Sequence, residues 1–335
     1  MVKFTVSPEN GITVNFIDKK IHLDPIRSSD ADYVFISHAH LDHMKGIMNT
    51  KANLLASEET AFLAGKRGFQ LEIMNNIPED FELINSGHIL GSSGLLIGKK
   101  LFYTGDFTTR SRAFMKGCKP VDCEVLIIES TFGKKQYIFP PIEEIEKKVN
   151  QIIANLFSKG TPIILMGYSL GKAQILSHLF SSWDPIYVQE PIYDMNKAYI
   201  ERGIQLRDDL IPLSIAEKNG LLKKKPWILL SSLGNGNNTL VNSLKEKYGA
   251  ATIAFSGWSA DYRYRLMRNI DYSIPISDHC DFNELVETVK KCNPSRVYTV
   301  HGFADEFASH LRSIGFEAQS LNNKQRIISD FSPEE

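Results

Sequence analysis

The stretch "FISHAHLDHMKG", residues 35–46, places three histidines and an aspartate within six positions, directly after an apolar run. Side chains two residues apart on an extended segment point the same way, so His38 and His40 can bind one metal ion where a strand ends. Asp42 and His43 lie in the following turn and can face a second ion. Imidazole nitrogen and carboxylate oxygen suit Zn²⁺, with Mn²⁺ or iron as alternatives. The spacing predicts a site for two metal ions, the alternative being a polar turn that is rich in histidine by chance.

The composition is that of an ordinary globular protein. The chain has 335 residues, of which 43% are hydrophobic and 23% charged, enough for one large or two ordinary domains. No apolar run approaches the ~20 residues that cross a bilayer, and the N-terminal residues lack the pattern of a signal peptide. We therefore expect a cytoplasmic protein that does not associate with membranes.

The cysteines and the net charge bear on which metal ligands and which binding partners are expected. Cys118, Cys123, Cys280 and Cys292 show no C-x-x-C spacing, so we expect reduced thiols, with no role for cysteine as a metal ligand. The net charge is −1, so the whole-molecule field would not attract a polyanion. Binding to nucleic acid would depend on a local basic patch or on the charge of bound metal ions.

Two patterns of secondary structure follow one another along the chain. Short strands and turns fill residues 1–37, and further strands are predicted at 81–86, 94–98, 100–105 and 125–130, each ending near a chemically interesting residue. From about residue 141, amphipathic helices alternate with buried strands, which predicts a parallel sheet. A strand at 298–303 returns to the first pattern. Because no long linker or repeat separates the patterns, the middle segment is expected to be a domain inserted into the first.

Further motifs follow the histidine cluster in an order that resembles a known family. They are "SGHILGSSG" (86–94), "YTGDF" (103–107), "IIESTFG" (127–133), "ISDHCD" (276–281) and "VHGF" (300–303). Together with H-x-H-x-D-H after a buried strand, they resemble the metallo-β-lactamase fold and, within it, the β-CASP branch, which cleaves nucleic acids. The resemblance covers nearly the whole chain. It implies an α/β protein, an αββα sandwich of residues 1–133 and 271–335, with an inserted α/β β-CASP domain at 134–270 whose parallel sheet is flanked by helices.

The resemblance also implies which residues bind two zinc ions, with Mn²⁺ as the alternative metal. The ligands implied for one ion are His38, His40 and His88. The ligands implied for the other are Asp42, His43 and His301. Asp106 would bridge the two ions. A core histidine is the alternative for His88, and a turn cap is the alternative for Asp106.

His279 and Glu129 match the catalytic pair of the family, and Asp42 is a third catalytic candidate. Phosphodiester hydrolysis needs an activated water, neutralised charge on the phosphate and a proton for the leaving oxygen. Two ions ~3.5 to 4 Å apart meet the first two needs, with attack by a bridging hydroxide. His279, paired with Glu129, would protonate the leaving oxygen. A solvated loop histidine and a loop or helix-capping carboxylate are the alternatives.

Two segments of the insert are candidates for binding the substrate. "GYSLGKAQ" (167–174) is not a P-loop, because only three residues separate its glycines and Ala173 follows the lysine. Lys172 at a helix N-terminus can still bind a backbone phosphate, or it is a solvated lysine in a structural turn. In "SGWSADYRYR" (256–265), Ser256, Arg263 and the neighbouring aromatic rings suit single-stranded nucleic acid. The alternative is the start of an amphipathic helix.

Within the β-CASP branch, "ESTFGKKQYIFPP", "GYSLGKAQ", "SGW" and "ISDHCDF" resemble the ligase-associated DNA exonucleases and archaeal factors similar to messenger-RNA 3′-end-processing proteins. This favours a zinc-dependent exonuclease on single-stranded DNA ends, in DNA repair or processing. The histidine of "VHG" is shared with RNA-cleaving members, so an exo- or endoribonuclease in RNA processing is the alternative. A small-molecule hydrolase such as a thioesterase or lactonase is less favoured, because those enzymes lack the insert and the Glu129–His279 pair. A non-catalytic binding subunit is the remaining alternative.

Overall fold

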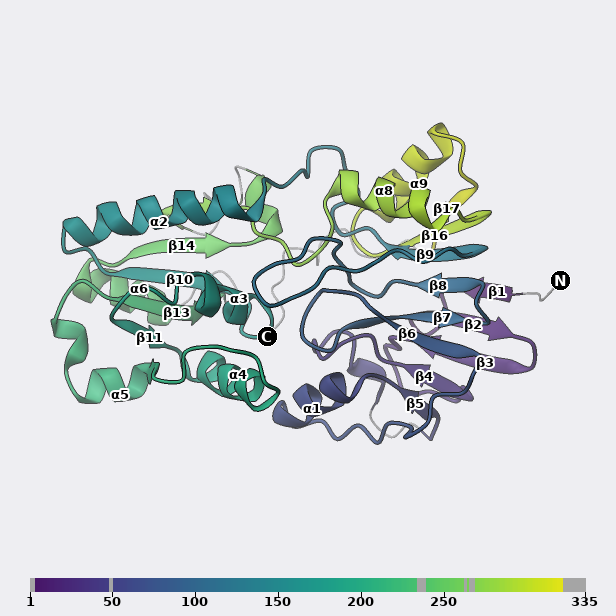
Figure 1. Cartoon of the computed structure of the whole chain (residues 1–335), viewed down its shortest axis with the longest axis horizontal. Helices are drawn as coiled ribbons and strands as arrows, with labels where there is room; N and C mark the ends of the chain where they lie inside the picture. Colours follow the sequence, from purple (N-terminus) through teal and green to yellow (C-terminus); the bar gives the residue numbers. More distant parts are fainter. Residues whose placement is uncertain (1–3, 48–50, 234–238, 262–263, 265–268, 322–335) are drawn as a thin grey trace. The chain divides into compact units, whose positions relative to one another are not determined.

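The structure is a computed structural model that describes residues 4–47, 51–233, 239–261, 264 and 269–321. It divides into two compact units (Figure 1). Unit 1 draws its described residues from Met1–Ser111, Met115–Tyr137 and His279–Glu334, and unit 2 draws its own from Arg112–Phe114 and Ile138–Asp278.

Unit 1 contains two β-sheets. In the first, two antiparallel pairings join the first three strands and two parallel pairings add the rest; its order is β1 (Phe4–Ser7), β2 (Ile12–Phe16), β3 (Lys19–Leu23), β4 (Tyr33–Phe35), β5 (Asn53–Leu55). The order of the second is β17 (Ala318–Ser320), β16 (Arg296–Val300), β9 (Val125–Glu129), β8 (Leu101–Tyr103), β7 (Ser93–Ile97), β6 (Phe81–Asn85). The second sheet is antiparallel from β6 to β8 and parallel from β8 to β17.

Apolar side chains that alternate along these strands form the layers of unit 1. One buried cluster joins Val14 and Phe35 of the first sheet to Leu95 and Ile127 of the second, so the two sheets pack face to face. The opposite face of the second sheet packs against helices α8 (Phe282–Cys292) and α9 (Ala304–Ser313) (Figure 1). Helix α1 (Glu58–Lys66) lies near β5, and a short 3₁₀ helix, η1 (Lys45–Ile47), follows the histidine-rich segment.

Unit 2 is one parallel sheet between two layers of helices. The strand order is β12 (Ile211–Pro212), β11 (Ile186–Val188), β13 (Ile228–Ser232), β10 (Ile163–Gly167), β14 (Ala251–Phe255), β15 (Tyr272–Ile274). The helices are α2 (Ile142–Ser158), α3 (Lys172–Leu179), α4 (Glu190–Glu201), α5 (Leu213–Lys218) and α6 (Thr239–Tyr248), with 3₁₀ helices η2 (Leu221–Lys223) and η3 (Gly257–Ala260). One face of the sheet packs against α2 and α3, and the other packs against α5 and α6. Helix α2 forms where its sequence predicts it, because Ile145, Val149 and Ile153 recur at helical spacing and are buried.

The predicted fold class, an α/β sandwich interrupted by an α/β insert with a parallel sheet, is confirmed. The units differ from the predicted division at residues 112–114, 134–137 and 271–278. Strand β15 explains the last difference, because Tyr272 and Ile274 pair with Ile253 and Phe255 of β14. A parallel ladder thus assigns to unit 2 a segment that the motif-based boundary assigned to the sandwich.

No helix among the described residues is long and apolar enough to span a membrane. The four cysteines are buried free thiols, and burial raises the pKa of the Cys118 thiol to about 12.

Candidate metal centre

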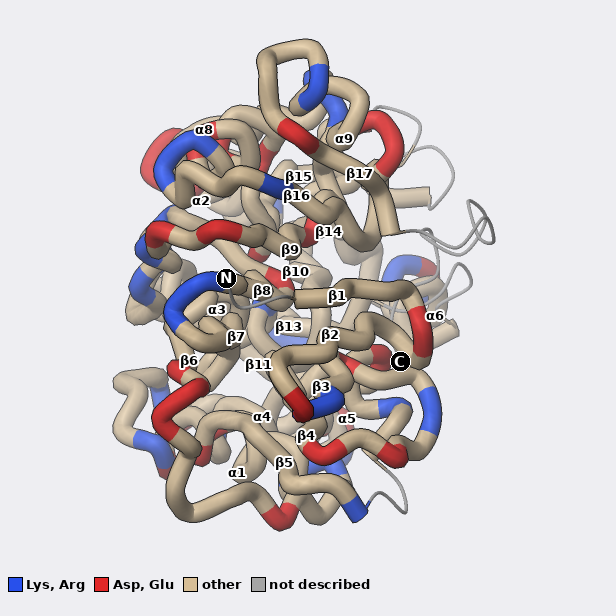
Figure 2. The backbone as a smooth tube through the Cα atoms, turned by 90° about the vertical axis from the view of Figure 1, so that its right-hand side faces the viewer, with Lys and Arg blue, Asp and Glu red and all other residues tan. Residues whose placement is uncertain are grey.

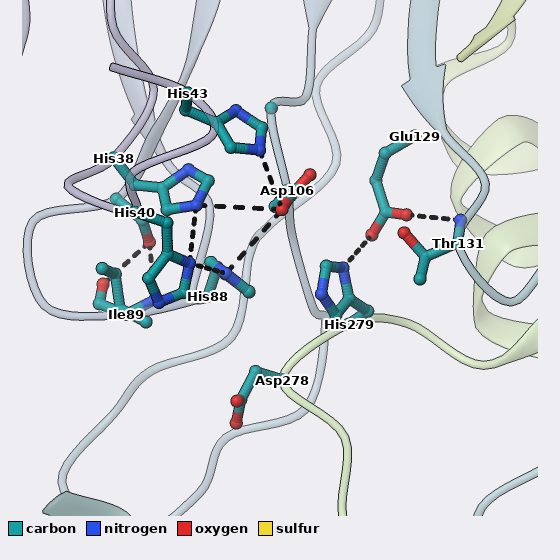
Figure 3. Close-up of polar contacts among 12 residues, drawn as sticks. His38, His40, His43, His88, Ile89, Asp106, Glu129, Thr131, Asp278 and His279 are labelled. Atoms are coloured by element: carbon teal, nitrogen blue, oxygen red, sulfur yellow. Dashed lines mark hydrogen bonds and ion pairs between the residues drawn. The ribbon is translucent and has the colours of Figure 1, made fainter. Parts of the chain in front are cut away.

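Three buried imidazoles face one another at one edge of unit 1 (Figure 3). His38 and His40 follow β4, and His88 follows β6. His40 Nδ1 lies 2.9 Å from His38 Nε2 and 3.1 Å from His88 Nε2. The three rings are at most 7% exposed. The predicted ligands of one zinc ion are thereby brought together.

One oxygen of Asp106 faces this group and His43 as well. Asp106 Oδ2 lies 3.3 Å from His43 Nε2 and 3.8 Å from both His38 Nε2 and His88 Nε2. Asp106 reaches this position from the loop after β8. A carboxylate that contacts both sets of imidazoles has the placement expected of a bridging ligand.

The electrostatic environment suits a divalent cation. Burial, with the neighbouring imidazoles, holds the pKa of His38 well below its usual value, so this ring is neutral and can donate a lone pair. Burial by itself raises the pKa of Asp106, but His43 and His279 outweigh it and hold that pKa well below the usual value. Imidazole nitrogens and a carboxylate within 4.8 Å of one another are the donor set that zinc prefers. The residues present therefore fit the metal that the motifs imply.

The environment of His43 is different. Burial alone lowers its pKa, but the carboxylates of Asp42, Asp106 and Asp24 together outweigh burial and hold the pKa well above 6.5. Without a metal, the three acids favour the protonated form of this imidazole. A cation at the same position would replace the proton and keep the charge balance with the three acids.

Asp24 is a functional residue that the sequence analysis missed. Its Oδ1 accepts from the Ser37 backbone N–H at 2.7 Å, and its Oδ2 accepts from Ser37 Oγ at 2.6 Å and Tyr103 Oη at 2.8 Å. Asp24 Oδ2 also lies 2.9 Å from His43 Nδ1. The available signal was that Asp24 directly follows strand β3, because the other functional residues also lie at strand ends.

The hydrogen bonds of Asp24 fix the ring orientation of two histidines. His43 Nδ1 donates to the carboxylate, which turns Nε2 toward the metal centre. The Ser37 hydroxyl donates to Asp24 and so accepts from His38 Nδ1, 2.9 Å away. His38 therefore also presents the lone pair of Nε2. Such outer partners set the tautomer and basicity of metal-binding histidines.

Asp42 and His301 are placed more loosely. Asp42 Oδ2 lies 3.4 Å from His43 Nε2, and its side chain is 37% exposed. The ring of His301 lies 5.7 Å from that of His43, centroid to centroid. Among the described residues, neither joins a group of three ligand atoms within 4.8 Å. The ligand set predicted for the second zinc ion is thus less compact than the first.

His301 has a strained backbone. Its φ is +58°, and Gly302 follows at +49°. A non-glycine residue in this region costs energy and persists only where the surroundings enforce it. Ser130 Oγ donates to the His301 carbonyl at 2.9 Å and to the Val300 carbonyl at 2.8 Å. These bonds hold the backbone where strand β16 ends at Val300, earlier than the predicted strand at 298–303.

The predicted catalytic pair lies beside the buried ligands. His279 Nδ1 is 3.0 Å from Glu129 Oε1, and the His279 ring is 4.6 Å from that of His88. Glu129 is fully buried at the end of β9, and its Oε2 accepts from the Thr131 backbone N–H at 2.8 Å. The side chain of His279 is 21% exposed. The carboxylate is fixed within the protein, and the imidazole that it contacts is partly exposed. Figure 3 shows the pair beside the histidine cluster.

The predicted substrate-binding residues are placed away from the surface or lie outside the described part of the chain. Lys172 is 2% exposed, and its Nζ is 2.8 Å from Asp278 Oδ2 and 2.9 Å from the Ile276 carbonyl. The solvated lysine considered as an alternative is therefore wrong, and the ammonium group belongs to an internal ion pair of unit 2. Ser256 is 1% exposed and caps η3 by accepting from the Trp258 N–H. Arg263 lies outside the described residues.

Comparisons with known proteins agree with this geometry. The family model of a Zn-dependent metallo-hydrolase RNA specificity domain matches residues 267–320. A protein of Opitutus terrae described as a probable DNA ligase is 29% identical over 88% of this chain, which spans 29% of that protein. An RNase J-like protein of Methanocaldococcus jannaschii is 24% identical, and the match covers 89% of this chain and 85% of that protein. Cleavage and polyadenylation specificity factor subunit 3 of Dictyostelium discoideum is 21% identical, with 91% and 51% covered.

A solved structure has the same fold. The crystal structure of a protein of unknown function from Enterococcus faecalis V583 matches with a TM-score of 0.62 at 15% identity, covering 97% of this chain and 96% of that one. At this identity the match is informative about the fold alone.

The fold and the buried cluster of histidine and aspartate define the class, which is a metal-dependent hydrolase. The matches along the chain support the metallo-β-lactamase, β-CASP nuclease family that its motifs resemble.

Proposed function

We propose that this protein is a zinc-dependent exonuclease that hydrolyses the phosphodiester bonds of single-stranded DNA ends. The observation that carries the proposal is the His279–Glu129 pair beside the buried ligand cluster, with Nδ1 and Oε1 3.0 Å apart. A hydrolase that expels an alkoxide from a phosphodiester needs a proton donor at this position. The lactonase and thioesterase alternatives do not call for one.

The roles of the residues follow from their contacts. Zinc ions held by the histidine and aspartate ligands would supply an activated water and neutralise charge on the phosphate. Glu129 is ordered by Thr131 and accepts from His279 Nδ1, so it stabilises the charged imidazolium and directs Nε2 toward the substrate. His279 would then give its proton to the leaving oxygen.

The surface charge fits a substrate that is recruited through the metal centre. The chain has 38 lysines and arginines against 39 aspartates and glutamates, and the two kinds are interspersed along the part of the chain that Figure 2 describes. Attraction of the phosphate backbone would then come chiefly from bound cations.

DNA is favoured by the similarity to the Opitutus protein, which is described as a probable DNA ligase and is 29% identical over most of this chain. RNA is the second candidate, because relatives from Methanocaldococcus and Dictyostelium are described as an RNase J-like protein and a cleavage and polyadenylation factor. The polymer is therefore the first property to measure.

The test uses one sequence as single-stranded DNA and RNA, each labelled at the 5′ or the 3′ end, with zinc-loaded protein and with a chelator added. Chelator-sensitive laddering of DNA would support the proposal, and the label that is lost first would give the polarity. Preferred cleavage of RNA would move the protein to RNA processing. Cleavage of neither polymer by zinc-loaded protein would refute a nuclease function.

A further inference from the structure

The first turn of helix α8 lies just after His279 and is bound by an arginine that no motif singled out. Asp281, the N-cap, accepts from the Glu284 N–H at 3.0 Å through Oδ1, and Glu284 Oε2 accepts from the Asp281 N–H at 2.8 Å. The other oxygen of each acid is bound by Arg110, through Nη2 to Asp281 and through Nε to Glu284 at 2.6 Å. Asp281 and Glu284 thus form a capping box, and the guanidinium group of Arg110 binds the carboxylate oxygens that the box leaves over.

Arg110 ties the loop of His279 to the loop of Asp106. Arg110 lies four residues after Asp106, and the backbone N–H of Cys280 donates to the Phe107 carbonyl at 2.9 Å. The segment that contributes the bridging acid is therefore bound to the segment that contributes the proton donor at two points, one on the backbone and one through Arg110. Both points directly follow Asp106 and His279 along the chain, within five residues of each.

The residue before His279 is also held, inside unit 2. Asp278 Oδ1 is 3.1 Å from Arg112 Nη1, and Asp278 Oδ2 is 2.8 Å from Lys172 Nζ. All three side chains are at most 6% exposed. Each acid that flanks His279 thus binds an arginine from the segment 110–112. Arg110 is the accessible member of the pair, since its side chain is 31% exposed.

We propose that Arg110 is a positioning residue for His279, a role that rests on the proposed nuclease function. A general acid works only within hydrogen-bond reach of the leaving oxygen, and a displacement of ~1 Å can cost ~100-fold in rate. Without Arg110, Asp281 and Glu284 repel each other where the loop turns into α8. His279 then leaves its place beside the metal centre, while the ligands and the binding of substrate stay unchanged.

The experiment compares two substrates that differ in their need for a general acid. One is the oligonucleotide that the wild-type protein cleaves; the other is thymidine 5′-monophosphate p-nitrophenyl ester, whose p-nitrophenolate leaves without a proton. Arg110→Ala should lower kcat on the oligonucleotide about 10- to 100-fold, with KM and the bound zinc unchanged. Its rate on the ester should stay within about twofold of wild type. Arg110→Lys should restore part of the lost kcat, because lysine supplies the charge but not the fork.

The matched control is Arg296→Ala. Arg296 also binds a carboxylate of unit 1, with Nε 2.8 Å from Glu317 Oε1, at the start of β16 and far along the strand from His301. This variant should keep both rates. His279→Ala is the reference for a missing general acid. It should lose cleavage of the oligonucleotide and keep the wild-type rate on the ester.

Each outcome separates the two proposals. If Arg110→Ala slows both substrates equally, or retains the kcat of Arg296→Ala on the oligonucleotide, the positioning role is wrong. If Arg110→Ala does not fold, the two substrates are compared with Arg110→Lys instead. Lysine cannot bind both acids as the guanidinium does, so a wild-type kcat on the oligonucleotide in this variant would also overturn the positioning role. If zinc-loaded wild type cleaves neither substrate, it is the proposed function that fails. If His279→Ala keeps the oligonucleotide rate, His279 is not the general acid, and the positioning role of Arg110 is wrong while the nuclease function stands.

Discussion

Replacing Asp24 by asparagine should weaken both the fold and the metal centre, and the structure sets the size of the effect. The carboxylate receives one hydrogen bond at Oδ1, from the Ser37 N–H, and three at Oδ2, from Ser37 Oγ, Tyr103 Oη and His43 Nδ1. An asparagine keeps the three only if its oxygen takes the place of Oδ2. Its NH₂ group then faces the Ser37 N–H, and one buried hydrogen bond is lost. The opposite orientation loses the bond from His43 Nδ1 and requires the hydroxyls of Ser37 and Tyr103 to turn and accept from the NH₂ group.

The loss of the single hydrogen bond from the Ser37 N–H sets the minimum effect on stability. Leaving one buried backbone donor unpaired costs about 1–3 kcal/mol in the free energy of unfolding. Zinc affinity should fall about 10- to 100-fold, because His43 then donates to a neutral oxygen that supports its basicity less than a carboxylate does. Urea unfolding of the metal-free protein measures the first quantity, and competition with a chromophoric chelator measures the second.

Asp30→Asn is the control, because Asp30 is an exposed acid six residues further along the chain. Its Oδ1 lies 3.0 Å from Lys20 Nζ. It should leave zinc affinity and unfolding as in wild type. An Asp24→Asn protein that unfolds and binds zinc like wild type would show that the carboxylate does not orient His43, and the account of the metal centre given by its hydrogen bonds would be wrong.

Three further predictions concern buried ionisable groups. Lys172→Ala should destabilise unit 2 by about 3–5 kcal/mol in urea unfolding, because Asp278 loses a buried cation; unchanged unfolding would contradict the ion pair. Because the pKa of His43 is raised above 6.5 in the folded metal-free protein, its stabilising contribution is complete below that value and is lost as the pH rises through the raised pKa. The thermal midpoint of the metal-free protein should therefore fall at alkaline pH, and zinc binding at neutral pH should release a proton, seen as a calorimetric enthalpy that depends on the buffer. Burial raises the pKa of Cys118 to about 12, so native protein should not react at this thiol with a disulfide reagent that labels it rapidly after unfolding.

The sequence alone determined the chemistry wherever ligands lie close along the chain. The spacing of His38, His40 and His43 is local, and a strand followed by a turn can direct such residues to only a few positions. The alternation of amphipathic helices and buried strands likewise predicts the parallel sheet of unit 2, because each strand carries its own apolar pattern. These features depend on short segments of sequence, so they can be predicted without knowledge of the rest of the fold.

Tertiary structure alone decided which distant residues are partners. Asp24 meets His43 across 19 residues and Tyr103 across 79, and Arg110 meets Asp281 across 171. These pairings depend on strand register and on how sheets and helices pack, and a one-residue shift in register would turn a side chain to the opposite face. Strand β15 and Lys172 show the same dependence, since a ladder with β14 and the buried acid Asp278 determine their places. The end of a strand can be predicted from the hydrophobic pattern. The distant side chain that contacts the residue at that end is determined only when the whole sheet has formed.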